Sequence, residues 1–271
     1  LAIVGDVNRF LSDLLEDAVV NCEEWMNFCR EVTEALPKNE SSNSTHLGYV
    51  NPYSFVGALS RLCQSDDVIV PCSSGGAFTV MMQAFENKTG QTMITNKGLA
   101  SMGYGLAGAI GASIAAGERR TVLVEGDGGF SQNLQELATV AVNQLPLKIF
   151  VFSNEGYASI RMTQRNYFGG QYLGCDTETG LGFPDWKLLA RAYGLPYYEI
   201  ATLDDLGDDF PELWNSDSAA FFVVKIHPEQ TYFPKISSRV TETGGMESAP
   251  LHLMTPDLDA KTSALVFRHI P

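Results

Sequence analysis

Two short polar motifs, each following an apolar stretch, constrain the fold of this chain more than any other feature. A Gly-Asp-Gly-Gly sequence at 126–129 follows the apolar run 121–124, and Asn154 follows the apolar run 147–152. Both runs have the length and composition of buried β-strands. Asp127 and Asn154 are 27 residues apart (154 − 127), which leaves room for one helix and one returning strand. A right-handed β-α-β unit would therefore bring a carboxylate and an amide together at one edge of a sheet.

An edge of this kind suits a metal ion and a phosphate group. Oxygen ligands with a single formal charge fit Mg²⁺, which completes its coordination with phosphate and water oxygens. The helices expected after Gly129 and Tyr157 would direct N-terminal N–H groups towards the same phosphate. A Gly-Asp-Gly sequence alone is most often a surface turn. The interpretation therefore depends on the two strand contexts and their spacing.

The charge and composition of the chain limit its partners. Eighteen Lys and Arg residues against 32 Asp and Glu residues give a formal net charge of −14. Because so acidic a surface repels nucleic acid and anionic membranes, we expect neither as a partner. The sequence has no run of about 18 apolar residues, and its five cysteines form no C-x-x-C pair. These features favour a cytoplasmic protein with reduced thiols.

Apolar stretches alternate with helix-forming stretches between residues 67 and 226. We expect strands at 67–70, 92–95, 121–124, 147–152, 197–200 and 221–226. We expect helices at 52–63, 77–85, 103–116, 131–143, 185–193 and 203–214, and another after Tyr157. Near-continuously apolar strands alternating with helices indicate an α/β fold, with a mostly parallel sheet and helices on both faces. Ligands bind such sheets beyond the carboxyl ends of the strands.

Composition also predicts how the chain is divided. Residues 1–36 combine a short strand from Leu1 with an amphipathic helical stretch, and we expect the tail of a preceding central domain. Residues 37–49 are rich in Ser and Asn and are expected to form a linker. Residues 50–230 should form the main domain. Residues 231–271, interrupted by Pro and Gly, should form an extended C-terminal tail.

A second glycine pattern offers an alternative interpretation. The sequence 103–108 matches G-x-G-x-x-G, and Glu125 lies 20 residues beyond Gly105 (125 − 105), where dinucleotide-binding folds place a ribose-binding acid. That fingerprint has to follow its strand directly, whereas residues 96–101 intervene here. A closely packed helix explains these glycines better. A dinucleotide-binding oxidoreductase domain stays open as the alternative.

The Gly-Asp-Gly sequence 126–128 and Asn154, at this spacing, resemble the diphosphate and Mg²⁺ motif of thiamine-diphosphate enzymes. The stretches 98–106 and 135–139 narrow the resemblance to the acetolactate synthase-like branch. It covers residues 67–226, and residues 1–15 resemble the end of the central domain of that family. The resemblance implies the C-terminal, diphosphate-binding part of such an enzyme, with thiamine diphosphate and Mg²⁺ as cofactors.

The resemblance also implies roles for individual positions. Mg²⁺ would be bound by the side chains of Asp127 and Asn154 and by the backbone carbonyl of Gly156. Met102 would support the bent conformation of the cofactor. The residues implied in cofactor binding are Ser74, Gly75, Gly76, Ala100, Met102, Gly126, Asp127, Gly128, Gly129, Asn154, Gly156, Tyr157 and Ala158.

Enzymes of this branch decarboxylate a small 2-keto acid such as pyruvate, and then protonate the resulting enamine or transfer it to a second carbonyl. Their activating glutamate lies in a separate pyrimidine-binding domain, usually of a partner subunit. No part of this chain resembles that domain, so we expect no catalytic acid or base within it. We expect a decarboxylase or carboligase fragment of a homo-oligomer that is inactive without the pyrimidine-binding domain. A non-catalytic assembly subunit of such an enzyme is the other alternative.

Overall fold

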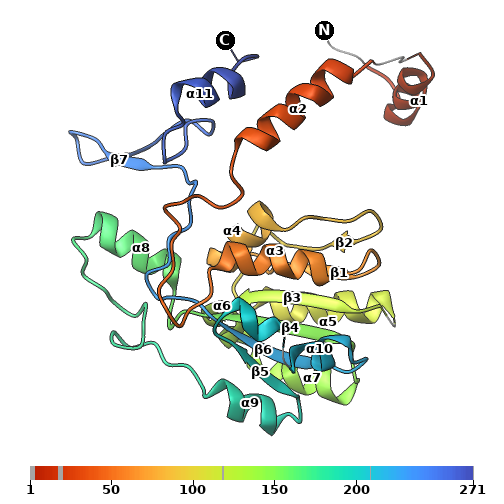
Figure 1. Ribbon diagram of the computed structural model, residues 1–271, viewed down its shortest axis with the longest axis vertical. Helices are drawn as coiled ribbons and strands as arrows, with labels where there is room; N and C mark the ends of the chain where they lie inside the picture. The colour runs from red at the N-terminus through yellow and green to blue at the C-terminus, as the bar shows by residue number, and fades with distance from the viewer. Residues whose placement is uncertain (1–3, 18–20, 118, 208, 271) are drawn as a thin grey trace. The chain divides into compact units, whose positions relative to one another are not determined.

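The computed structural model describes residues 4–17, 21–117, 119–207 and 209–270 (Figure 1). The chain divides into two compact units, Leu1–Pro37 with Asp257–Pro271 and Lys38–Pro256. The strand expected at the start of the chain falls largely on residues 1–3, outside the described residues. Within the described parts, no helix is both long enough and apolar enough to cross a membrane.

The larger unit is built on one parallel sheet, which confirms the predicted α/β fold. Its strands are β1 (Val68–Val70), β2 (Thr92–Met93), β3 (Thr121–Gly126), β4 (Leu147–Ser153), β5 (Tyr197–Ile200) and β6 (Ala220–Lys225). Their order is β2-β1-β3-β4-β6-β5, and each neighbouring pair is parallel. At the centre, Gly126 of β3 pairs with Phe152 of β4. Asp127 and Asn154 therefore leave adjacent strands at the same edge.

Helices cover both faces of this sheet (Figure 1). One face packs against α3 (Pro52–Leu62), α4 (Gly75–Ala84) and α10 (Phe210–Asn215). The other face packs against α5 (Tyr104–Ala116), α7 (Leu137–Val142) and α9 (Trp186–Ala192). Successive β4 residues alternate between the two cores: Phe150 and Phe152 belong to the first, Ile149 and Val151 to the second. Burial on both faces explains why these strands are apolar throughout.

Two predicted helices differ from the structure. The helix expected at 131–143 begins earlier, as α6 (Asp127–Phe130), continues as a 3-10 helix (Ser131–Glu136) and ends as α7. Asn133 has non-helical dihedral angles (φ −146°, ψ 33°) and separates the parts. Glycines are poor helix formers, costing about 1 kcal/mol each relative to alanine. Because of Gly128 and Gly129, the sequence pattern does not predict the helical turn at 127–130.

The helix expected at 203–214 is also divided. A 3-10 helix (Leu203–Leu206) has a capping box between Thr202 and Asp205 at its N-terminus. The helix α10 begins separately at Phe210. Pro211 lies in the first turn of α10, where its missing N–H is not needed. A proline at this point cannot continue a helix from the preceding turn.

The segments before and after the main fold are joined to each other within the larger unit. The buried Asn43 side chain accepts a hydrogen bond from the Phe233 N–H (2.8 Å) and donates one to the Phe233 carbonyl (2.8 Å). Gln230 donates to the Asn43 carbonyl (3.3 Å). Further on, β7 (Ser238–Val240) and β8 (Met246–Ser248) form an antiparallel hairpin. Residues 231–256 thus contain more regular structure than an extended tail.

The smaller unit consists of α1 (Val7–Asp17), α2 (Glu23–Ala35) and α11 (Ala260–Val266). The rings of Trp25 and Phe28 on α2 contact the ring of His269, with centroid distances of 5.9 and 4.7 Å. Arg268 forms an ion pair with Glu31 at 3.2 Å. These contacts attach the C-terminal helix to α2.

Candidate functional site

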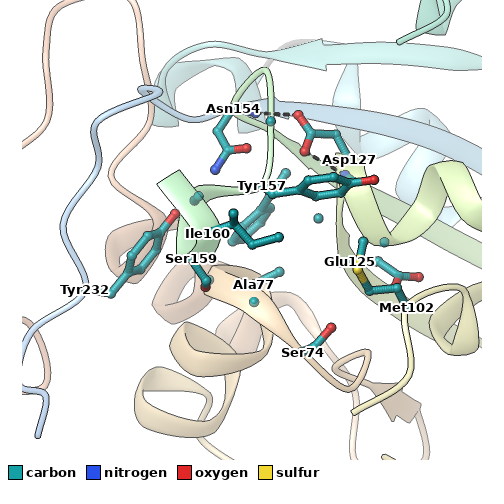
Figure 2. A pocket seen from close by; sticks show the side chains of 18 of the residues that line it. Ser74, Ala77, Met102, Glu125, Asp127, Asn154, Tyr157, Ser159, Ile160 and Tyr232 are labelled. Atoms are coloured by element: carbon teal, nitrogen blue, oxygen red, sulfur yellow. Dashed lines mark hydrogen bonds between the residues drawn. The ribbon is translucent and has the colours of Figure 1, made fainter. Parts of the chain in front are cut away.

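A cavity lies at the carboxyl ends of β1, β3 and β4 (Figure 2). The structure brings all the sequence-predicted site residues to its wall: Ser74, Gly75, Gly76, Ala100, Met102, Gly126, Asp127, Gly128, Gly129, Asn154, Gly156, Tyr157 and Ala158. Residues without a predicted role in this site also line it: Ala77, Glu125, Phe152, Ser159, Ile160 and Tyr232. The cavity therefore occupies the position at which parallel sheets bind ligands.

Asp127 is one of two buried acids that line this cavity, with 1% of its surface exposed. Its Oδ2 accepts hydrogen bonds from the N–H groups of Asn154 and Glu155, both at 2.9 Å, and Oδ1 accepts one from Gly128 at 2.7 Å. Burial raises its pKa to about 7, against the opposing effect of these N–H groups. A bound cation would favour the ionised form. Three backbone N–H groups thus fix the position of the carboxylate, and a cation beside it would lower its raised pKa.

The Asn154 side chain completes a set of three oxygens. In one orientation of its amide, the nitrogen donates to the Gly156 carbonyl (2.8 Å) and to Asp127 Oδ1 (3.2 Å). In the opposite orientation the amide oxygen occupies that place, so three oxygens converge without a hydrogen between them. Adjacent ligands of an octahedral Mg²⁺, each about 2.0–2.1 Å from the ion, lie about 2.9 Å apart. The chemistry and spacing of these oxygens therefore fit a small hard cation.

This ligand set differs from the commoner clusters of ionisable side chains. Among the described residues, no group of three or more His, Cys, Asp or Glu side chains could hold a metal ion. One carboxylate, one amide and one backbone carbonyl instead leave room for the oxygens of a charged ligand.

Hydrogen bonds to a neighbouring backbone segment and to a buried side chain fix the loop that carries the Gly156 carbonyl. Glu155 has a left-handed φ of 62°, and the Tyr157 N–H donates to the Cys175 carbonyl at 2.8 Å. The buried Arg161 side chain donates to the carbonyls of Glu155 (3.1 Å) and Pro228 (2.6 Å). A Cβ atom at Gly156 would lie 2.3 Å from the Cys175 carbonyl oxygen. The close approach of two backbone segments therefore requires glycine at this position.

Two helices begin at the cavity without a side-chain cap. Ser74 precedes α4 and Tyr157 precedes α8 (Ala158–Tyr167), and neither side chain makes a capping hydrogen bond within the described structure. The first N–H groups of a helix have no partner inside it and attract anions. These two helix ends can thus bind the oxygens of a phosphate group beside the three converging oxygens.

Glu125 is a lining residue whose orientation the sequence did not reveal. It is 2% exposed, and its carboxyl group faces the first turn of α5. Burial raises its pKa to about 8, although the N–H groups of Leu106 and Gly105 act in the opposite direction. A Cβ at Gly105 would lie 2.0 Å from Glu125 Oε2, and one at Gly129 would lie 2.6 Å from Oε1. The second glycine of the G-x-G-x-x-G pattern, Gly105, is thus explained by the packing of the Glu125 side chain against α5.

Tyr232 is the other lining residue that the sequence did not indicate. Its side chain is 9% exposed, and its ring packs on Gly76, where a Cβ would lie 2.5 Å from Cζ. Figure 2 shows its hydroxyl directed into the cavity on the side of Asn154. Burial raises its pKa, and a hydrogen bond from the Asn154 side chain opposes this shift. An amide that donates to Tyr232 presents its oxygen to Asp127 and Gly156.

Comparison with known proteins identifies the family. Residues 74–224 match the family model described as "Thiamine pyrophosphate enzyme, C-terminal TPP binding domain". The match covers more than half of the chain. The chain belongs to the thiamine pyrophosphate enzyme family. Every predicted site residue from Ser74 to Ala158 lies inside the matched segment, and Tyr232 lies beyond it.

The sequence is also similar to large subunits of acetolactate synthase. It is 30% identical over 242 residues to the isozyme 2 large subunit of Escherichia coli (strain K12), covering 87% of this chain and 41% of that protein. It is 26% identical over 240 residues to a probable acetolactate synthase large subunit of Methanococcus aeolicus, covering 83% and 40%. The chain thus spans about two-fifths of the length of these relatives.

A solved structure shares the fold. The thiamine diphosphate-dependent 4-hydroxybenzoylformate decarboxylase of Rhodococcus jostii RHA1 matches 71% of this chain and 35% of its own, with a TM-score of 0.59 and 22% identity. These comparisons confirm the predicted family and fold. A domain of this kind implies thiamine diphosphate as its ligand and normally works alongside other domains of thiamine pyrophosphate enzymes.

Proposed function

We propose that this chain is the diphosphate-binding part of an acetolactate synthase-like enzyme that decarboxylates a small 2-keto acid such as pyruvate. The observation that carries the proposal is the convergence of the Asp127 carboxylate, the Asn154 amide and the Gly156 carbonyl between the uncapped ends of α4 and α8. A charged diphosphate needs a cation and N–H donors together in an acidic protein. The cavity offers both.

Each group of lining residues has a separate part in this proposal. Asp127, Asn154 and the carbonyl of Gly156 hold Mg²⁺. The backbone of Gly128, Gly129, Tyr157 and Ala158 binds the diphosphate on the β3 and β4 side. Ser74, Gly75 and Gly76 bind it from the start of α4, while Ala100, Met102 and Gly126 shape the remaining wall.

When bound, thiamine diphosphate supplies the carbon centre that forms a bond to the carbonyl of the keto acid and accepts its electrons when CO₂ leaves. The residues of this chain bind and orient the cofactor at its charged end. A pyrimidine-binding domain or subunit, which residues 1–271 do not resemble, provides the activating acid, and the assembled enzyme is a homo-oligomer. The exposed apolar side chains of Leu99, Met102 and Ile160 beside the cavity fit a surface that such a domain covers.

Calorimetry with thiamine diphosphate, in the presence and absence of Mg²⁺, tests the cofactor assignment. We expect binding that depends on Mg²⁺, because the metal neutralises the repulsion between the diphosphate and the Asp127 carboxylate. Heat that is the same with EDTA as with Mg²⁺ would contradict the proposal. CO₂ release from pyruvate after mixing the chain with a pyrimidine-binding partner distinguishes a catalytic half-site from an assembly subunit.

Tyr232→Phe should weaken Mg²⁺-dependent binding of thiamine diphosphate about tenfold, within the range found when residues that orient metal ligands are replaced. The variant keeps the packing on Gly76 but removes the oxygen that accepts from the Asn154 amide. The measurement is a Mg²⁺ titration at fixed cofactor concentration. Tyr198→Phe, which removes a hydroxyl that bonds to the Asp205 carbonyl (2.8 Å) outside the cavity, is the control. Equal Mg²⁺ affinity in both variants would show that Tyr232 does not orient Asn154.

A further inference from the structure

A groove on the larger unit lies between α8 and the segment 235–238. It is lined by Met162, Thr163, Asn166 and Tyr167 of α8 and by residues 235–238. On α8, Ser159 of the cofactor cavity is followed at helical spacing by Met162, Thr163 and Asn166, so these side chains lie on one face. In the tail, Tyr232 lines the cavity and Lys235 lines the groove. Both walls of the groove thus continue walls of the cavity.

The groove contains a cation, Lys235, for which the described part of the chain provides no carboxylate partner. Lys235 is partly buried, its Nζ lies 3.2 Å from the Met162 sulfur, and it lies 5.0 Å from the centre of the Phe233 ring. Within the described residues, no carboxylate comes within ion-pair distance of this amine. Glu229, the acid bound by the neighbouring Arg165, is already paired. Burial and the nearby Arg165 both lower the pKa of Lys235. A bound anion would oppose this shift by stabilising the protonated amine.

The position of Lys235 is set by its backbone. Its N–H donates to the Thr255 carbonyl at 3.0 Å, and its carbonyl accepts from the Thr255 N–H at 2.8 Å. The Ser237 hydroxyl is 2.6 Å from the Thr255 hydroxyl. These contacts with Thr255 hold the segment in place. On the α8 side, the Asn166 amide is a neutral donor that lines the same groove, whereas the Thr163 hydroxyl donates its hydrogen to the Ser159 carbonyl at 3.0 Å.

We infer that this groove binds the anionic end, a carboxylate or a phosphate, of a substrate whose reacting carbonyl lies in the adjoining cavity. The inference rests on the proposed function and extends it to the class of substrate. Lys88 and Lys148, two further amines removed from solvent, donate to backbone carbonyls, whereas the only acceptor that the described residues give the Lys235 amine is the Met162 sulfur. Lys235 follows Tyr232 by three residues, a reach of at most about 10 Å. This is an upper bound between Cα atoms, and the long Lys235 side chain covers part of it, so the substrate has to span only the remainder.

The test measures the binding of three probes to the full 271-residue chain by calorimetry. Pyruvate has no second anionic group, 2-oxoglutarate has a distal carboxylate, and dihydroxyacetone phosphate has a phosphate. At least one of the two longer anions should bind about tenfold more tightly than pyruvate, and Lys235→Met should abolish that difference. Lys235→Arg should keep it, because the charge is retained. The probe that binds distinguishes a carboxylate from a phosphate.

Lys187→Met removes the same charge from α9, outside the cavity and the groove, and should leave all three affinities unchanged. Equal affinity for pyruvate and both anions, or undiminished preference in Lys235→Met, overturns the inference. Mg²⁺-dependent binding of thiamine diphosphate, measured on the same samples, tests the proposed function separately. An anion preference that depends on Lys235 without cofactor binding would contradict the proposed function and leave the anion site supported.

Discussion

Asp127→Asn should reduce the Mg²⁺-dependent affinity of the chain for thiamine diphosphate by about 100-fold or more, the largest change expected from a single side chain. Replacement of residues that merely support metal ligands costs 10–100-fold, and Asp127 is the one charged ligand proposed for the metal. Asparagine has nearly the same shape, but it lacks the charge that holds the cation. Its NH₂ group would also face either the ion or the N–H groups of Asn154 and Glu155.

Two measurements check this expectation. Calorimetry gives the affinity directly, and thermal unfolding gives it through linkage, because a ligand at about 100 times its Kd stabilises the native state by about 2.7 kcal/mol. The wild-type chain should show that stabilisation with thiamine diphosphate and Mg²⁺ together, and Asp127→Asn should not. Unfolding without ligands shows whether the variant is folded.

Asp185→Asn is the matched control for the loss of one carboxylate. Asp185 caps α9 by accepting a hydrogen bond from the Leu188 N–H at 2.9 Å, and asparagine caps helices about as well. This variant should bind the cofactor normally. Wild-type affinity in Asp127→Asn at saturating Mg²⁺ would exclude Asp127 as a metal ligand.

The part of the site that could be predicted from the sequence is the part built from neighbouring strand ends. The positions of Asp127 and Asn154 follow from two apolar strands and the rule that β-α-β units are right-handed, and pairing of β3 with β4 brings them together. These relations depend on local spacing, which a sequence displays. The role of the Gly156 carbonyl is implied by the resemblance to thiamine-diphosphate enzymes and not by the spacing.

The residues that could not be predicted depend on contacts between distant segments. Tyr232 reaches the cavity because Asn43 binds the backbone of Phe233, 190 residues away in the chain, and no motif marks that pair. Glu125 turns towards α5 because Gly105 leaves space for its carboxyl group. The same glycine fits a dinucleotide fingerprint equally well. A sequence pattern does not show whether a missing side chain leaves space for a ligand or for a neighbouring residue.

Gly156→Ala tests the third proposed ligand, a backbone carbonyl that no side-chain deletion can remove. The added methyl group would lie 2.3 Å from the Cys175 carbonyl oxygen, 2.5 Å from Arg161 Nη2 and 3.1 Å from the Asp176 Cα. The Cys175 carbonyl accepts the Tyr157 N–H, and Arg161 is buried and hydrogen-bonded. Movement of either neighbour would break hydrogen bonds, so we expect the loop itself to move.

We expect Gly156→Ala to cost about 1–3 kcal/mol of unfolding free energy, as overpacking of a filled site does. It should also lower the Mg²⁺-dependent affinity for thiamine diphosphate by at least tenfold, because displacement of the loop moves one of the three oxygens. Chemical denaturation and calorimetry measure the two effects separately. Gly111→Ala is the control. Gly111 lies in α5, and a Cβ atom added there would have no other atom within 4 Å.

Alanine is a better helix former than glycine by about 1 kcal/mol, so Gly111→Ala should stabilise the chain slightly and leave cofactor binding unchanged. If Gly156→Ala loses stability but keeps full Mg²⁺-dependent affinity, the loop tolerates displacement and its carbonyl does not bind the metal. If it loses affinity out of proportion to stability, the fixed position of the carbonyl is what the metal requires. The rigid support from Cys175 and Arg161 favours the second result, because both constrain the backbone on either side of Gly156.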